Sequence, residues 1–224
     1  MRRWLAACAL GMVVAVWVVS AAEATLLEEA YAKFPAEAAE GTQFSFAVLG
    51  DSRYWQPVIQ PEVFREMVRE ANLLRASLIF DVGDLIHGYT NDTALLNREW
   101  AEFEAVVRSS EMPFIPVVGN HDVSAPMHEA LYEQRIGKLY FSFDFGNAHF
   151  VCLDSEPVGE PSNTVEAQTE WLKGDLEAAR GKHIFVFLHR PWWREAKIWD
   201  PIHRLLAAHG VEAVIAGHEH HYQM

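Results

Sequence analysis

The chain contains little cysteine, with only two in its 224 residues. Cys8 lies in an N-terminal apolar run that we expect to be removed, so the mature chain would keep Cys152 alone. A single cysteine cannot form an internal disulfide, and its place in an apolar stretch predicts a small core residue. The shortage of thiolates also excludes a soft, sulfur-rich metal site.

Basic residues are also few, with 18 lysines and arginines against 31 aspartates and glutamates, and a formal net charge of -13. This balance disfavours the nucleic-acid backbone and anionic membrane surfaces as partners. A chain rich in carboxylates can nevertheless hold metal cations, and those cations can recruit anionic substrates locally.

The chain lacks an apolar run of the length that a membrane span needs. The charge-free run at 4–19 is shorter than the ~20 residues that a spanning helix needs. It follows Arg2 and Arg3 and precedes Ala22-Glu23-Ala24, a small-x-small cleavage site. We therefore predict a signal peptide over 1–24, a secreted or periplasmic protein, and no stable membrane association after cleavage. A membrane-anchored scaffold is the alternative, and it requires this run to survive.

Residues 25–224 are long enough for one domain, and their pattern is typical of an α/β fold. After a helical or loosely ordered lead-in at 25–41, strands and helices alternate, and a hairpin turns at Gly146-Asn147. The predicted strands are 44–49, 77–82, 114–118, 140–145, 148–153, 183–188 and 211–216, and the predicted helices are 62–75, 94–107, 164–179 and 201–209. Because the chain stops shortly after His220, we expect the C-terminal part of the domain to be missing.

The first helix has apolar residues that we expect to form one buried stripe. They are Val63, Phe64, Met67, Leu73 and Leu74. Pro61 stands suitably at the start of this helix, and Asp92 or Thr93 could cap the next one.

Five strand-like runs end on side chains that can bind a metal ion. These are Asp51, Asp84, Asn120 with His121, His189, and His218 with His220. A glycine stands just before the donor in four cases, which suits a sharp turn or a close approach to an ion. Because buried strands bring their ends to one edge of a sheet, this pattern predicts a metal site at that edge.

The motifs resemble, in order, those of calcineurin-like metallophosphoesterases. They are Gly50-Asp51-Ser52-Arg53, Gly83-Asp84, Gly119-Asn120-His121-Asp122, His189-Arg190-Pro191 and Gly217-His218-Glu219-His220, with the helix that carries Gln168, Trp171, Leu172, Asp175 and Leu176. The resemblance covers nearly all of residues 25–224. It implies a four-layer αββα sandwich of two mixed sheets flanked by helices, with two metal ions at their edge.

The resemblance also implies the role of each ligand. Asp84 would bridge two ions, Asp51 and His220 would bind the first, and the second would be held by Asn120, His189 and His218. Carboxylate, amide and imidazole donors suit Fe, Mn or Zn. Such a pair would activate a bridging hydroxide for in-line attack on a phosphate-ester substrate. We predict His121 as the proton donor to the leaving group, with Asp122 holding its tautomer.

Arg53 departs from the family pattern, because many members carry a histidine ligand at this position. A guanidinium has no lone pair and cannot bind a metal ion. It could clamp a substrate phosphate, or it could form an ion pair that orients Asp51. In either case the first ion keeps three protein ligands against four for the second, so weaker occupancy of the first site is expected.

Two functions stay open at this point. The first is an exported metal-dependent phosphomonoesterase or phosphodiesterase. The second is a metal-binding or phospho-ligand-binding module that has lost catalysis, although retention of His121 argues against it. Trp192 and Trp193 could wall the pocket or pack in the core. His149 is expected to be a hydrogen-bonded core histidine, and Asp154-Ser155-Glu156 is expected to cap a loop.

Overall fold

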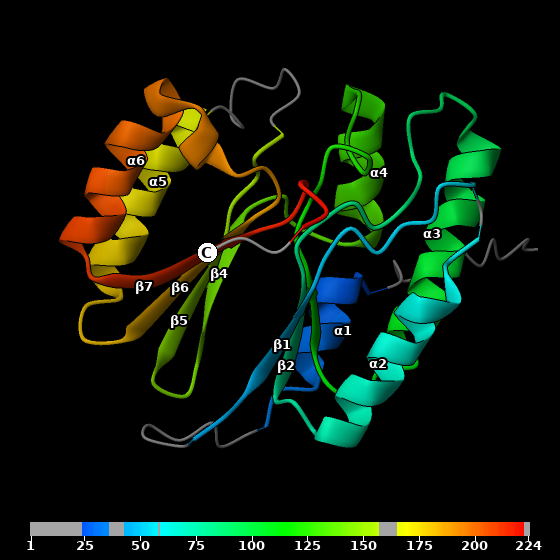
Figure 1. Cartoon of the computed structure of the whole chain (residues 1–224), viewed down its shortest axis with the longest axis horizontal. Coiled ribbons are helices and arrows are strands. Elements are labelled where there is room, and N and C mark those ends of the chain that lie inside the picture. Colours follow the sequence, from blue (N-terminus) through cyan, green and yellow to red (C-terminus); the bar gives the residue numbers. More distant parts are fainter. Residues whose placement is uncertain (1–23, 36–42, 58, 157–164, 222–224) are drawn as a thin grey trace, which may run out of the picture.

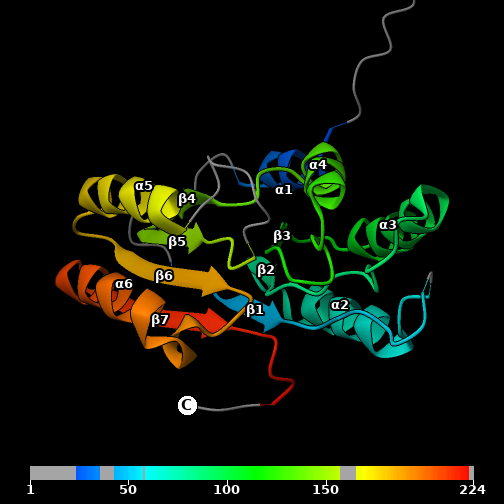
Figure 2. The same cartoon turned by 90° about the horizontal axis from the view of Figure 1, so that it is seen from above.

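The computed structural model describes residues 24–35, 43–57, 59–156 and 165–221, so the predicted signal peptide over 1–24 lies almost entirely outside the described residues. Two sheets face each other at the centre, with helices on both outer sides (Figures 1 and 2). The elements are α1 (Leu26–Ala32), β1 (Phe46–Leu49), α2 (Glu62–Leu74), β2 (Leu78–Asp81), α3 (Thr93–Val107), β3 (Phe114–Pro116), α4 (Pro126–Arg135), β4 (Phe141–Phe145), β5 (Ala148–Cys152), α5 (Val165–Ala178), β6 (His183–Leu188), a 3-10 turn η1 (Trp192–Arg194), α6 (Ala196–Ala208) and β7 (Val211–Ala216).

The strand order explains how the two sheets arise. One sheet has the order β1-β2-β3 and is parallel, and the other has the order β4-β5-β6-β7. Among the strand pairs of the described residues, only β4–β5, the predicted hairpin, is antiparallel. The expected αββα layers are therefore present, but in the described part of the chain only the second sheet is mixed. Strand-helix alternation explains the parallel pairs, because each helix carries the chain back to the same end of the sheet.

The space between the sheets is filled by aromatic side chains from both of them. Phe80 of β2 stacks on Phe187 of β6 with ring centroids 4.0 Å apart, and Phe150 of β5 packs against both rings. All three are fully buried. Cys152 lies in the same cluster as a buried free thiol, as its apolar surroundings predicted. This core fixes the two sheets against each other, and with them the loops that follow their strands.

Helix α2 buries a different face from the predicted one. Of the five apolar residues expected in its stripe, only Phe64 is buried, and it stacks on Phe103 of α3. Leu73 and Leu74, at 78% and 79% exposure, lie on the open side near the end of the helix. The buried face continues instead through Val68 and Ala71, which follow Phe64 at helical spacing.

Two other helices differ from expectation at their starts. Helix α6 begins at Ala196, so Pro201 lies inside the helix rather than opening it. Helix α4 was not predicted, because its apolar signal is weak; Pro126 begins it, and the buried Tyr132 anchors it. Helix α3 begins as predicted, with Asp92 accepting hydrogen bonds from two backbone N–H groups. Among the described helices, none is long and apolar enough to cross a membrane.

Candidate metal centre

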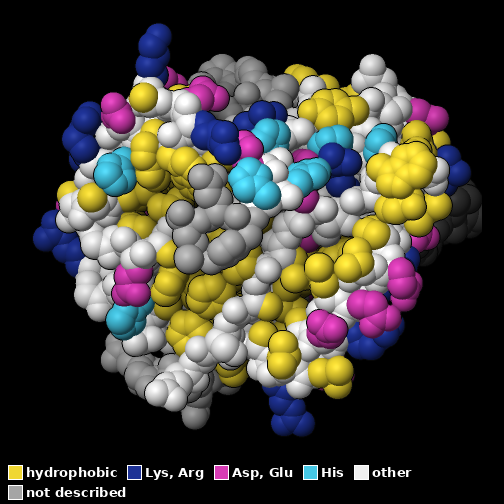
Figure 3. Space-filling model, viewed as in Figure 1, with side chains coloured by type: hydrophobic (Ala, Val, Ile, Leu, Met, Phe, Trp, Pro, Cys, Tyr) yellow, Lys and Arg dark blue, Asp and Glu magenta, His cyan; other side chains and the backbone are white. Residues whose placement is uncertain are grey.

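The loops that follow the strands meet at one end of the sandwich. The backbone N–H of Asp51, after β1, donates to the carbonyl of Gly83, after β2, at 3.0 Å. The N–H of Gly217, after β7, donates to the carbonyl of His189, after β6, at 3.0 Å. In the space-filling view, histidines gather with acidic and basic side chains around this end (Figure 3). The convergence expected from parallel strands is thus seen in the backbone itself.

The glycines before the donors allow this close approach. A Cβ on Gly119 would lie 2.2 Å from the backbone nitrogen of Asp84, and one on Gly83 would lie 2.8 Å from the His189 ring. Several of the donors also have a backbone in the left-handed region, with positive φ at Asp51 (52°), Asp84 (60°), His218 (71°) and His220 (51°). Such angles are unfavourable for residues with a Cβ and are enriched at functional sites.

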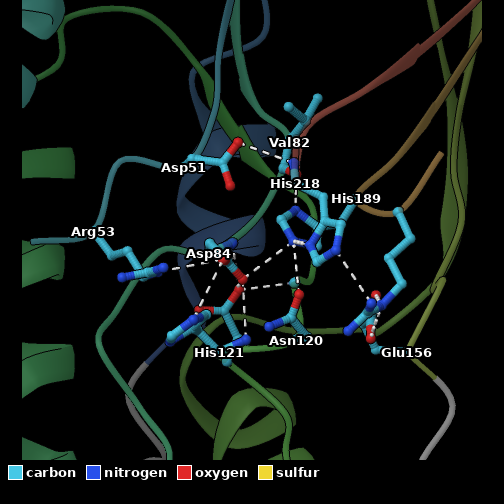
Figure 4. Close-up of polar contacts among 12 residues, drawn as sticks. Asp51, Arg53, Val82, Asp84, Asn120, His121, Glu156, His189 and His218 are labelled. Atoms are coloured by element: carbon cyan, nitrogen blue, oxygen red, sulfur yellow. Dashed lines mark hydrogen bonds and ion pairs between the residues drawn. The ribbon is translucent and has the colours of Figure 1, made fainter. Parts of the chain in front are cut away.

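Four predicted ligands bring nitrogen and oxygen atoms to a common point (Figure 4). The Nε2 atom of His189 lies 3.2 Å from Asp84 Oδ1 and 3.1 Å from Asn120 Oδ1. The Nδ1 atom of His218 lies 3.3 Å from the same Nε2 atom. Asp84, Asn120 and His189 are buried, so these donors are shielded from bulk water. Carboxylate, amide and imidazole donors at one point form a set that suits a borderline divalent ion.

His189 has its ring fixed by a backbone group. Its Nδ1 atom donates to the carbonyl of Val82 at 2.8 Å, and the side chain is fully buried. A neutral imidazole with its proton on Nδ1 presents the Nε2 lone pair, and here that lone pair faces Asp84 and Asn120. An outer hydrogen bond of this kind is the usual means of orienting a histidine ligand.

A second group of donors lies beside the first and shares Asp84. This group contains Asp51, Asp84 and His220. Each contributes one possible ligand atom, and these atoms all lie within 4.8 Å of one another. The Oδ1 atom of Asp51 is buried and makes no hydrogen bond in the described part of the chain, although His220 Nε2 lies 3.1 Å away. A buried carboxylate oxygen without a hydrogen bond is costly, and a cation bound by Asp51 and His220 would remove that cost.

His121 lies beside Asp84, but Asp122 does not orient it. The Nδ1 atom of His121 donates to the carbonyl of His87 at 2.5 Å, and its Nε2 atom lies 3.8 Å from Asp84 Oδ2. Burial lowers the pKa of His121, and the Asp84 carboxylate partly opposes this effect. The expected tautomer contact from Asp122 is therefore replaced by a backbone carbonyl, which has no signature in the sequence.

Asp122 instead holds the loops of the site together. Its oxygens accept hydrogen bonds from the backbone N–H groups of Gly119, Asp84, Leu85 and Ile86. Burial and the nearby Asp84 raise the pKa of Asp122, and these amide donors oppose the shift. Asp122 thus acts on the backbone that carries Asp84.

Arg53 forms an ion pair with Asp84, rather than with Asp51. Its Nε atom lies 3.3 Å from Asp84 Oδ2, and its side chain is 18% exposed. Figure 4 shows Arg53 reaching Asp84 from the side opposite His189. Nε makes this contact, and within the described residues no hydrogen bond of the terminal nitrogens is seen.

Sequence reasoning missed Tyr89, which touches two predicted site residues. Its hydroxyl accepts a hydrogen bond from Asn120 Nδ2 at 2.9 Å, and its ring packs edge-on against His121 with centroids 4.5 Å apart. Tyr89 is 55% exposed and has φ of 53°. It lies five residues after Asp84 in a loop held by Glu99, whose carboxylate accepts from the Gly88 N–H. A tyrosine among loop residues gives no sequence signal for such a contact.

The structure also shows where the remaining aromatic and polar residues considered in the sequence lie. Trp192 is buried in the core below α6, and the partly exposed Trp193 packs edge-on against Trp199. His149 is a buried, hydrogen-bonded core histidine, as expected. Asp154 Oδ1 accepts from the Glu156 N–H, which is the predicted loop cap, while Glu156 pairs with Arg190.

Every predicted metal ligand lies within the segment of the chain that matches a known protein family. The sequence profile of the calcineurin-like phosphoesterase family matches residues 44–222. The chain belongs to this family. Membership, which the motif series predicted, is thereby confirmed.

Curated proteins with similar sequences include human tartrate-resistant acid phosphatase type 5. It is 26% identical over 195 residues, which cover 71% of this chain and 60% of that protein. Purple acid phosphatase 15 from Arabidopsis thaliana is 28% identical over 140 residues, covering 51% of this chain and 26% of that protein. The chain therefore spans 60% or less of the length of these two relatives.

Solved structures of two phosphatases share the fold. A purple acid phosphatase from yellow lupin seeds aligns with a TM-score of 0.61 at 16% identity, covering 84% of this chain and 39% of that one. A dimetal phosphatase from Danio rerio aligns with a TM-score of 0.62 at 15% identity, covering 79% of this chain and 82% of that one. These alignments confirm the predicted α/β sandwich.

Proposed function

We propose that this protein is an exported, dinuclear-metal-dependent phosphoesterase that hydrolyses a phosphomonoester or a phosphodiester by in-line displacement. The observation that carries this proposal is the convergence of donor atoms on two adjacent points that share Asp84. Membership of a phosphoesterase family supports a phosphate-ester substrate.

The proposed ligands divide between two ions. Asp51, Asp84 and His220 would hold the first, and Asp84, Asn120, His189 and His218 the second. The donor chemistry fits Fe, Mn or Zn, and the hydrogen-bond-free Oδ1 atom of Asp51 fits a cation as its missing partner. When bound, such a pair acts as a Lewis acid on the phosphoryl group and lowers the pKa of a water molecule.

His121 would handle the proton of the leaving group. Its Nδ1 atom is committed to the carbonyl of His87, so Nε2 is the only ring atom that can exchange a proton in the site. Burial lowers the pKa of His121, and the Asp84 carboxylate, 3.8 Å from Nε2, partly opposes this shift. A proton carried on Nε2 could therefore be delivered to a leaving oxygen on that side. Asp122 would support this step indirectly, by fixing the backbone of Asp84.

Arg53 would bind the substrate phosphate through its terminal nitrogens while Nε stays on Asp84. The same residue also motivates the alternative function, a phospho-ligand-binding module of impaired activity, because it leaves the first ion with three protein ligands. A cation at 3.3 Å from Asp84 Oδ2 further weakens that site by competing for the carboxylate.

An activity panel tests the proposal. The metal-free protein would be supplied with Mn, Zn, Fe or Co and assayed with p-nitrophenyl phosphate and bis(p-nitrophenyl) phosphate. Metal-dependent turnover of one ester is expected, and the preferred ester separates a monoesterase from a diesterase. Absence of turnover with every metal would contradict an enzymatic function.

A single substitution separates the enzyme from the binding module. His121→Ala is expected to lower turnover by about 10²–10⁴-fold, the usual contribution of a general acid, without loss of bound metal. His203→Ala, in α6 and outside the site, serves as the control. Equal turnover in wild type and His121→Ala would remove His121 from the mechanism.

Export rests on the N-terminal sequence alone. We propose cleavage after Ala24, which would leave one phosphoesterase domain beginning at Thr25. N-terminal sequencing of the mature protein tests this step, and an intact Met1 would instead support the membrane-anchored alternative.

A further inference from the structure

Arg190 is held beside the candidate metal centre by groups that the proposed mechanism does not use. It follows His189 directly, and its backbone N–H donates to Ser155 Oγ at 2.8 Å. Its Nε atom lies 2.7 and 2.8 Å from the two carboxylate oxygens of Glu156. The Glu156 side chain is only 9% exposed, whereas that of Arg190 is 40% exposed. One edge of the guanidinium is therefore anchored, and its terminal nitrogens lie toward the site.

One of those terminal nitrogens contacts a predicted metal ligand. Arg190 Nη1 lies 3.2 Å from His218 Nε2. A guanidinium nitrogen can only donate, so His218 Nε2 must accept, and the single proton of its neutral ring must lie on Nδ1. Figure 4 shows Glu156 and His218 on the side of Asp84 away from Arg53.

This contact competes with metal binding at His218. The Nδ1 atom of His218 is the one that faces the donor cluster, 3.3 Å from His189 Nε2. A cation bound at Nδ1 needs that lone pair, which places the ring proton on Nε2 with no change in net protonation. Two N–H groups would then face each other across 3.2 Å, so the Arg190 contact and an ion at Nδ1 exclude each other.

We propose that Arg190 is a substrate-binding residue that His218 holds in the metal-free protein and that metal binding releases toward a phosphate oxygen of the substrate. This inference rests on the proposed phosphoesterase function. Glu156 keeps Nε in place during the change, so the released Nη groups stay beside the ion rather than turning into solvent. A guanidinium fork suits two oxygens of a phosphate group, and Arg53 offers a second one from the opposite side.

Two binding measurements on the full chain test this assignment. In metal-loaded protein, Arg190→Met should weaken binding of inorganic phosphate by about 10- to 100-fold, the effect of losing a charge-assisted hydrogen bond. In metal-free protein, Arg190→Met should bind Zn or Mn about 2- to 10-fold more tightly, because the competing hydrogen bond to His218 is gone. Calorimetric titration gives both affinities.

Control variants distinguish phosphate binding by Arg190 from a general effect of losing a positive charge and from a loss of stability. Arg180→Met removes the same charge from an exposed position in an ion pair with Glu177, and it should change neither affinity. Arg190→Lys keeps a cation for Glu156 but lacks the fork, so it should still weaken phosphate binding while retaining the wild-type melting temperature. Nitrogen-15 NMR of His218 should find the proton on Nδ1 without metal and on Nε2 with it.

The results that would overturn the assignment are specific. Unchanged phosphate affinity in metal-loaded Arg190→Met and Arg190→Lys would remove Arg190 from substrate binding. Metal affinity of Arg190→Met no higher than that of wild type would refute the competition at His218. If wild type hydrolyses neither ester while both affinities change as stated, the phosphoesterase proposal fails and Arg190 remains an anion-binding residue.

Discussion

The hydroxyl of Tyr89 accepts a hydrogen bond from Asn120 Nδ2 at 2.9 Å, which turns the amide oxygen of Asn120 toward His189. An amide can present either its oxygen or its nitrogen to a site, and only the oxygen binds a cation. Tyr89 therefore selects the productive orientation of Asn120.

Tyr89→Phe should accordingly lower the metal affinity of the second site by about tenfold. This is the usual effect of removing a hydrogen bond that orients a metal ligand. The ring contact with His121 is kept in this variant, so the effect isolates the hydroxyl. Metal titration is the measurement. Tyr140→Phe, whose ring packs against Trp171 outside the site, provides the matched control, and equal affinities in all three proteins would dismiss the role of Tyr89.

Arg53 should limit occupancy of the first metal site, because it contacts Asp84 Oδ2 and supplies no lone pair. Arg53→His is expected to raise the affinity of that site by about tenfold or more through an added imidazole ligand. Arg53→Gln removes the cation without adding a nitrogen ligand, so it should give a smaller rise. Metal analysis of the three proteins checks this ranking, and two tightly held ions in each of them would refute it.

Asp81 should make the metal-free protein less stable as the pH rises. Its side chain is fully buried, and burial raises its pKa to about 8, with the charges of Asp51 and Asp84 acting in the same direction. The unfolded value is near 3.8, so the folded state holds a proton that the unfolded state releases. The contribution of Asp81 to the free energy of unfolding is therefore largest below about pH 4 and is lost as the pH rises to about 8.

Asp81→Asn should remove most of this pH dependence and stabilise the protein at pH 8 by on the order of a few kcal/mol, since one pKa unit corresponds to about 1.4 kcal/mol. Urea unfolding in the presence of a chelator, between pH 4 and pH 9, gives the comparison. Asp92→Asn is the control, because asparagine caps a helix as well as aspartate does. Parallel curves for wild type and Asp81→Asn would contradict the buried proton.

His149 should contribute stability with the same sign but for a different reason. Its Nδ1 atom lies 2.7 Å from Asp144 Oδ1 on β4, and its Nε2 atom lies 2.9 Å from Asp175 Oδ2 on α5. Burial alone would lower its pKa, but the two carboxylates outweigh burial and raise it. Both ring nitrogens can donate only when the ring is charged. The two hydrogen bonds that join α5 to the hairpin through His149 are therefore both present below about pH 6.5. Their stabilising effect is lost as the pH rises through the higher pKa of the folded state.

His149→Gln should therefore lower the free energy of unfolding at pH 6 by about 1–3 kcal/mol, with a smaller loss at pH 9. Thermal or urea unfolding at both pH values measures the difference. His183→Gln, at the exposed start of β6, removes a histidine that pairs with Glu212 at the surface and should have little effect. A loss that is equal at pH 6 and pH 9 would show that the charged ring is not the stabilising form.

Much of the fold could be read from the sequence because its signals are local. The strands β6 and β7 begin and end where their apolar runs do, and the hairpin turns at Gly146-Asn147 as predicted. Helix α2 shows where this reasoning stops. Its length was predicted, but Leu73 and Leu74 are exposed, because the buried face depends on where α3 lies against it.

For the candidate site, too, some features follow from the sequence and others only from the tertiary structure. The sequence by itself determined which side chains could bind a cation and that each of them follows a strand, because donor chemistry and strand periodicity are local properties. Only the tertiary structure decided where their lone pairs point. His189 is oriented by the carbonyl of Val82 and His121 by that of His87, and every residue carries such a carbonyl, so no sequence pattern could mark these two.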